Sequence, residues 1–114
     1  MASTNKQLVQ GILTIYQRHG WELQRVLIKP AASLRPDGET KALFGDAQLI
    51  ETDFEAFWFA RPSHQGREAW ELRLLSEQPY ALFEAFETDQ IEEQREDSRR
   101  EMEARMRKHA AGRS

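Results

Sequence analysis

The sequence contains no cysteine. Disulfide bonds, thiolate metal ligands and cysteine nucleophiles are therefore excluded together, and the stability of the fold must come from packing. Long apolar runs are also missing, because no stretch approaches the roughly 18 consecutive apolar residues of a membrane helix. The opening residues 1–6 lack the apolar region of a signal peptide. We therefore expect a cytoplasmic protein that makes no contact with a membrane.

Motifs of catalysis and metal binding are absent as well. The sequence has no glycine-rich phosphate loop, no Gly-x-Ser-x-Gly motif and no His-x-x-x-His spacing. Its three histidines, His19, His64 and His109, fall on a predicted helix end, a turn and a charged C-terminal tail. We expect no catalytic activity, no metal ion and no cofactor.

The chain has 114 residues, which corresponds to one domain by length. Its 16 Lys and Arg residues and 19 Asp and Glu residues give a net charge of −3, which argues weakly against a polyanionic partner. The arginines are interleaved with glutamates, and this cancels the positive field that a nucleic acid requires.

The first third of the chain predicts a helix, a strand and a loop. Apolar residues recur at helical spacing over residues 4–19, with Ile15 on the apolar stripe and Gly20 at the end. A strand follows at residues 21–29, where alternation changes to a continuous apolar run. Residues 30–46 contain turn-forming residues without a period, so we expect a long loop.

The most informative stretch is a predicted hairpin, whose two aromatic-rich strands are joined by a turn at Pro62–Gly66. Successive side chains of a strand point in opposite directions. Phe57 and Phe59 therefore share one face, and Phe54 and Trp58 share the other. We expect the first pair to form the main core with apolar residues of the neighbouring strands: Val26, Ile28, Trp70, Leu72 and Leu74.

The C-terminal third predicts a second helix. Pro79 is typical of a helix start, and the apolar residues up to Phe86 would give about two core-facing turns. Beyond this point acidic residues dominate before Ser98 and basic residues after it, which complements the helix dipole at both ends.

This composition divides the chain into two predicted parts. We expect a single α+β domain over residues 1–90 and a charged, largely solvated helical extension over residues 91–114. Removing residues 98–114 is then expected to leave the fold intact. The extension offers few large apolar side chains: Ile91, Met102 and Met106.

The predicted fold is α+β, with elements in the order helix, strand, strand, strand, helix. The strands would form a small antiparallel three-stranded sheet with the helices packed on one face. Trp58 would then lie on a second, aromatic face without a cover. A self-complementary two-fold contact is the commonest way for a small protein to bury such a patch.

We therefore expect a non-catalytic protein-protein interaction or assembly module, a homodimer that uses the aromatic second face and the C-terminal helix. The candidate contact residues are Trp21, Phe54, Trp58, Ile91, Met102 and Met106. One alternative is a small apolar-ligand binding domain, in which the three candidate aromatic residues line a pocket closed by the loop 30–46. Another is a weak nucleic-acid contact through arginines of the hairpin and the tail.

Overall fold

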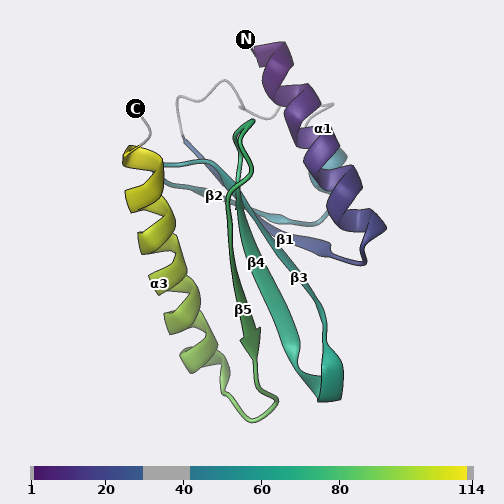
Figure 1. Cartoon of the computed structure of the whole chain (residues 1–114), viewed down its shortest axis with the longest axis vertical. Coiled ribbons are helices and arrows are strands. Elements are labelled where there is room, and N and C mark those ends of the chain that lie inside the picture. Colours follow the sequence, from purple (N-terminus) through teal and green to yellow (C-terminus); the bar gives the residue numbers. More distant parts are fainter. Residues whose placement is uncertain (1, 30–41, 113–114) are drawn as a thin grey trace.

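The computed structural model describes residues 2–29 and 42–112. Figure 1 shows a twisted sheet with one long helix at each side. The helices and strands, in chain order, are α1 (Ala2–Arg18), β1 (Glu22–Ile28), β2 (Gln48–Glu51), β3 (Ala56–Pro62), β4 (Glu68–Leu74), β5 (Ala81–Phe86) and α3 (Glu92–Ala111). A short helical segment at residues 42–44 precedes β2, and a 3-10 turn at His64–Gly66 joins β3 to β4.

The prediction of a three-stranded antiparallel sheet is wrong. The sheet has five strands in the order β2-β1-β3-β4-β5, and it is mixed because β2 runs parallel to β1. The class α+β remains correct. The strand predicted to begin at Gln48 is divided: residues 52–55 separate β2, which pairs with β1 on one side, from β3, which pairs with β1 on the other.

The second error concerns residues 81–86, which form β5 rather than helical turns. This segment pairs with β4 in a regular antiparallel ladder from Glu68↔Phe86 to Arg73↔Ala81. The apolar spacing of residues 81–86 fits either a helix or a strand. Without β5, a row of β4 backbone N–H and C=O groups would be unpaired, and pairing with β5 satisfies these groups. The loop predicted at 30–46 lies largely outside the described residues.

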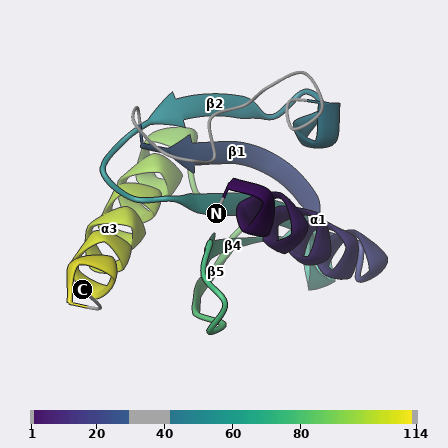
Figure 2. The same cartoon turned by 90° about the horizontal axis from the view of Figure 1, so that it is seen from above.

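The expectation of helices on one face is also wrong, because α1 and α3 cover opposite faces of the sheet (Figures 1 and 2). A first-face cluster joins the buried side of α1 to the sheet, and its members are Val9, Ile12, Leu13, Trp21, Val26, Ile28, Phe44, Phe57, Phe59 and Ala69. A second-face cluster lies under α3, and its members are Leu27, Phe54, Ala56, Trp58, Ala60, Trp70, Leu72, Leu74, Phe86, Met102 and Met106.

The ladder between β3 and β4 explains which aromatic residues share a face. Trp58 lies opposite Leu72, and Phe59 lies opposite Glu71. Directly opposed residues of an antiparallel pair point to the same face. The large apolar residues of β4 therefore pack with Trp58 under α3, and not with Phe57 and Phe59 as the sequence suggested; they are Trp70, Leu72 and Leu74.

The C-terminal helix packs against the sheet. Its outer surface is exposed and charged, but Arg99, Met102 and Met106 are buried. These residues are three and four positions apart, so they lie on one stripe of the helix. Acidic residues occupy its first turn and basic residues its last turn, as the sequence predicted. The second-face cluster therefore includes side chains from both predicted parts of the chain.

Gly11 provides a simple stability test. It lies exposed in the interior of α1, and a Cβ atom added there would meet no atom within 4 Å. We expect Gly11→Ala to raise the free energy of unfolding by about 1 kcal/mol, because alanine has the higher helix propensity. Gly66→Ala should do the opposite, since Gly66 has φ +78° and its added Cβ would lie 2.9 Å from Thr88 Cγ2. Chemical denaturation of both variants measures the two effects.

Candidate interaction surface

The structure brings four of the six predicted contact residues together. Phe54, Trp58, Met102 and Met106 all belong to the second-face cluster, and each is almost fully buried. The two predicted contact surfaces, the aromatic face and the C-terminal helix, therefore cover one another within one chain. Ile91 lies outside this cluster at the start of α3, and its side chain is 58% exposed.

Trp21 lies on the other side of the sheet, in the first-face cluster. The sheet separates it from Phe54 and Trp58. The pocket that these three residues were expected to line is therefore not formed.

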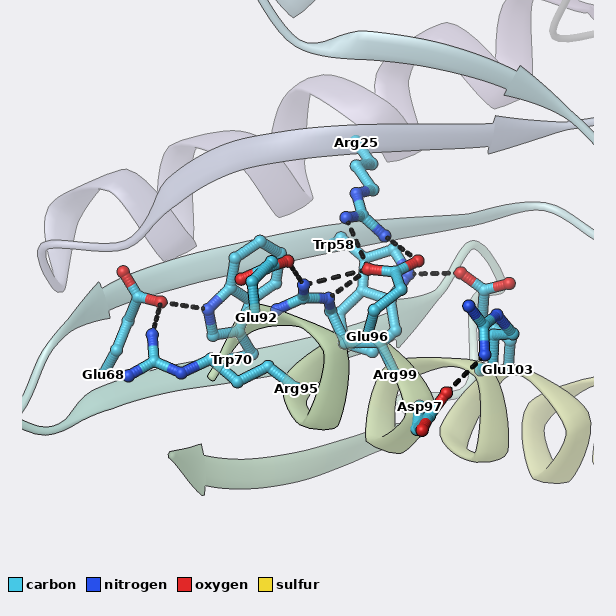
Figure 3. Close-up of polar contacts among 11 residues, drawn as sticks. Arg25, Trp58, Glu68, Trp70, Glu92, Arg95, Glu96, Asp97, Arg99 and Glu103 are labelled. Atoms are coloured by element: carbon cyan, nitrogen blue, oxygen red, sulfur yellow. Dashed lines mark hydrogen bonds and ion pairs between the residues drawn. The ribbon is translucent and has the colours of Figure 1, made fainter. Parts of the chain in front are cut away.

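A chain of ion pairs holds α3 against the sheet (Figure 3). The buried guanidinium of Arg99 lies 4.4 Å from the ring centroid of Trp70 and 2.9 Å from Glu96. It also pairs with Glu92. Glu96 in turn accepts a hydrogen bond of 3.0 Å from Arg25 on β1. One carboxylate thus links the helix to the sheet.

The protonation of Glu96 follows from this arrangement. Partial burial raises the pKa of its carboxyl, but hydrogen bonds from Arg25 and Arg99 oppose this effect and the net pKa is lowered. The carboxylate is therefore charged at neutral pH. Its two arginine partners compensate the cost of partial desolvation.

The two tryptophans of the second-face cluster have satisfied indole groups. Trp58 Nε1 donates to Glu103 of α3 at 2.7 Å, and Trp70 Nε1 donates to Glu68 at 2.7 Å (Figure 3). A buried tryptophan usually requires such an acceptor for its N–H group. The α3 helix therefore supplies both the apolar cover and the polar partner of Trp58, and this face requires no second molecule.

Two exposed apolar side chains lie instead on the first-face side of the sheet, one on α1 and one on β5. Ile15 is 55% exposed and Phe83 is 56% exposed. The Phe83 ring packs edge-on against Trp21, with 6.3 Å between ring centroids. A hollow of about 230 Å³ adjoins the Trp21 ring, and its lining residues are Ile15, Tyr16, His19, Trp21 and Glu71.

Tyr16 forms the base of this surface. Its ring stacks on Phe59 at 4.0 Å, and its hydroxyl donates a hydrogen bond to Glu71. Burial raises the pKa of the Tyr16 hydroxyl, and the hydrogen bond to Glu71 raises it further. The neutral phenol is therefore the form that this environment favours.

This shift predicts a stability change at alkaline pH. In the unfolded chain Tyr16 ionises near its ordinary pKa of 10.0, whereas in the folded protein it keeps its proton to higher pH. The contribution to stability is therefore complete below pH 10 and decreases above it. We expect urea melts at increasing pH to show this decrease in the wild type and a smaller one in Tyr16→Phe. Equal decreases would contradict the assigned environment.

Phe83 belongs to β5, and the outer edge of this strand is an edge of the sheet. Among the described residues no strand pairs with this edge, because β5 is the last strand of the sheet (Figure 2). The carbonyl of Tyr80 accepts a hydrogen bond from Leu74 N–H, so the backbone groups of residue 80 point toward β4. Orientation alternates along a strand. The N–H and C=O groups of Ala81, Phe83 and Ala85 therefore point outward from the sheet.

A second hollow, of about 350 Å³, lies near the C-terminal end of α3. Its lining includes Glu55, whose carboxyl pKa is raised by burial and partly lowered again by Lys29. Across the opening, Arg107 pairs with Asp53 at 2.7 Å. Ser76 also lines this hollow, but its hydroxyl donates a hydrogen bond to the carbonyl of Gln78 and not to a carboxylate or a histidine, so the described residues show no activated nucleophile there.

The arginines considered for nucleic-acid contact mostly have acidic partners. The ion pairs within the described residues are Arg25–Glu96, Arg67–Glu87, Arg95–Glu68, Arg99–Glu92, Arg99–Glu96, Arg100–Asp97 and Arg107–Asp53. Arg61 donates to the carbonyl of His19 and lies 4.7 Å from the Trp21 ring centroid. The described surface therefore presents paired charges instead of a basic patch.

Residues 2–29 and 42–112 contain neither a grouped set of metal ligands nor a membrane-spanning helix. No three His, Cys, Asp or Glu side chains there are grouped to hold a metal ion. Within the same ranges, no helix combines the length and apolar character required to cross a membrane.

Comparison with known proteins finds no matching family model, no matching curated protein and no matching solved structure. The candidate surface therefore depends on the geometry of this chain.

Sequence reasoning did not identify Phe83 and Ile15 as surface residues. It placed Phe83 in a core-facing helix and Ile15 on the buried stripe of α1. A signal for β5 was present, because residues 81–86 combine two phenylalanines and a leucine with a six-residue length typical of a strand. No comparable signal existed for Ile15, since the orientation of α1 depends on the sheet beneath it.

Proposed function

We propose that this protein is a non-catalytic assembly module that associates with a second copy of itself through the surface between α1 and β5. The observation that carries the proposal is Phe83, a large aromatic side chain that is 56% exposed on a strand edge with which no described strand pairs. Exposed apolar groups of this kind, next to free backbone donors and acceptors, mark interaction surfaces.

The composition of β5 supports the proposal. Natural proteins protect exposed edges with lysine, proline, bulges or very short strands. Residues 81–86 contain no lysine or proline and one charged residue, Glu84, and their pairing with β4 is regular over six residues. The opposite edge strand, β2, has only four residues, two of which are Gln48 and Glu51. The β5 edge is therefore the better substrate for strand addition.

The alternative functions have less support. The hollow beside Tyr16, about 230 Å³, is smaller than the roughly 300 to 1,000 Å³ typical of small-ligand sites. The hollow of about 350 Å³ near the end of α3 falls within this range, but charged residues make up much of its lining: Lys29, Asp53, Glu55 and Arg107. Nucleic-acid binding would require arginines that are free to contact phosphates, whereas most arginines of the described surface are paired. An apolar, hydrogen-bonding edge suits a protein partner.

The proposal predicts the effect of a charge at Phe83. We expect Phe83→Lys to weaken self-association at least about tenfold, because a lysine at the centre of the contact must be desolvated and the aromatic packing is lost. Leu49→Lys is the matched control, since Leu49 is an exposed apolar residue on the opposite edge strand. Light scattering over a concentration series measures both variants.

The wild type should show twice the monomer mass at high micromolar concentration, as should Leu49→Lys. A wild type that remains monomeric under these conditions contradicts the proposed function. Loss of the dimer in Leu49→Lys alone would place the contact at β2 instead.

A further inference from the structure

The geometry of β5 restricts how two copies can pair. A two-fold axis that relates adjacent antiparallel strands is perpendicular to the sheet, so each face continues into the same face of the partner. Opposed residues must then point to the same face. This condition holds only when the residue at the axis lies opposite the same residue of the partner. Near the middle of β5 that residue can be Leu82, Phe83 or Glu84.

The outward backbone groups favour one of these centres. When Phe83 is at the axis, Phe83 lies opposite the partner's Phe83, and Ala81 lies opposite the partner's Ala85. Each outward N–H and C=O group of these three residues then meets one of the partner's outward groups. The two phenylalanine rings lie side by side on the first face, and Leu82 opposes the partner's Glu84 on the second.

The other two centres are worse. A centre at Glu84 opposes two carboxylates directly, and like charges in this position are destabilising. A centre at Leu82 opposes Ala85 with the partner's Pro79, which has no N–H group to donate. Only the centre at Phe83 avoids both defects and uses every outward group.

The two helices leave room for this pairing. Strands in a sheet are about 4.8 Å apart, so β4 and the partner's β4 would be separated by about 14 Å. Packed helices require only about 8 to 10 Å between their axes. The α3 helix contacts both β4 and β5, and a helix centred between these strands would lie about 10 Å from its copy across the axis. The α1 helix contacts β1, which lies farther from the edge, and reaches β4 through Tyr16 near its C-terminal end. Figure 2 shows no described segment beyond β5.

We propose that a second copy adds to β5 in antiparallel orientation with Phe83 on the two-fold axis, so that two five-stranded sheets form one continuous ten-stranded sheet. This inference depends on the proposed self-association and specifies its register. The partner is the same chain, because in this register the edge is complementary to itself in hydrogen bonding and side-chain facing and places no two carboxylates directly opposite each other.

The absence of native cysteine makes disulfide trapping a specific test. In the proposed register the Cα atoms of Phe83 and the partner's Phe83 are about 5.5 Å apart, within the range of a disulfide. The same separation for Leu82 or Glu84 is about 7 to 8 Å, because these residues are diagonal to their own copies. Such a distance cannot be bridged without backbone movement.

We expect Phe83→Cys to form a cross-linked dimer under mild oxidation, and Leu82→Cys and Glu84→Cys to remain largely uncross-linked. Because Phe83→Cys also removes an aromatic ring, the double variant Ala81→Cys/Ala85→Cys provides a second test with Phe83 intact. Each of its cysteines opposes the other cysteine of the partner, whereas within one chain the two are about 13 Å apart. It should also cross-link.

The outcomes are distinguishable when light scattering accompanies the trapping. If the wild type forms dimers but Glu84→Cys or Leu82→Cys cross-links instead, the register is wrong and self-association stands. If dimers form and neither Phe83→Cys nor the double variant cross-links, the β5 contact is wrong. If the wild type is monomeric at high micromolar concentration, the proposed function itself is contradicted.

Discussion

Removing residues 98–114 is expected to abolish cooperative unfolding. The deletion takes away Arg99, Met102 and Met106, which are buried against the sheet, and uncovers the aromatic residues beneath them. Truncation of one buried methionine typically costs about 2 to 5 kcal/mol. The loss of two methionines and the surrounding helix should therefore cost more free energy than the roughly 5 kcal/mol at the low end of domain stabilities. Thermal and urea unfolding followed by circular dichroism measure the result.

The control for this deletion is a change on the outer surface of α3. Arg100 and Glu101 are exposed, and the ion pair of Arg100 with Asp97 is exposed on both sides. Exposed ion pairs contribute about 0 to 1 kcal/mol. Arg100→Ala/Glu101→Ala should therefore unfold nearly as the wild type does. A truncated chain that keeps a sharp transition would mean that α3 is a solvated extension after all.

Trp58→Glu is the second change with a large expected effect. Trp58 is fully buried between the sheet and α3, so the substitution replaces a large aromatic ring with a carboxylate beside Glu103. Truncation of a buried tryptophan costs about 3 to 5 kcal/mol, and an unpaired buried charge adds to this loss. We expect the variant to be unfolded at 25 °C, as measured by circular dichroism and by dispersion of amide proton shifts.

The matched control is Trp58→Phe, which keeps an aromatic ring and gives up the hydrogen bond to Glu103. It should remain folded with a moderate loss of stability. If Trp58 lay on a dimer surface, as the sequence predicts, Trp58→Glu would instead be a folded monomer. A folded, monomeric Trp58→Glu would therefore favour the earlier interpretation over the structure.

Local patterns were sufficient for several elements. The helix predicted at residues 4–19 corresponds to α1, and the hairpin turn at Pro62–Gly66 includes the 3-10 turn between β3 and β4. The alternation of Phe57 and Trp58 correctly placed them on opposite faces. In each case the signal depends on neighbouring residues alone, through helical period, strand alternation or turn chemistry.

The pairing of strands that are distant in the sequence could not be predicted from such local patterns. The parallel pairing of β2 with β1 depends on the path of a long connection, and no local pattern encodes it. The position of Trp70 relative to Phe57 required the register between two strands. Residues 81–86 fit a helix by apolar spacing and become a strand because β4 lies beside them.

The burial of the aromatic second face by α3 could not be predicted from local patterns either. Met102 and Met106 are only two apolar residues in a charged segment, so α3 was expected to be solvated. The stripe becomes apparent when Arg99 is included, because its guanidinium stacks on Trp70 and Phe86 while pairing with acids. A buried arginine is not recognisable as a core residue without its partners.

Hydrogen exchange of the β5 amide groups tests the central claim most directly. At concentrations where dimers form, the amide protons of Ala81, Phe83 and Ala85 should exchange slowly, and on dilution they should become fast. Those of Leu82, Glu84 and Phe86 should be protected in both conditions, since they point toward β4. If Ala81, Phe83 and Ala85 exchange rapidly at every concentration, β5 is a free edge and the proposed assembly is contradicted.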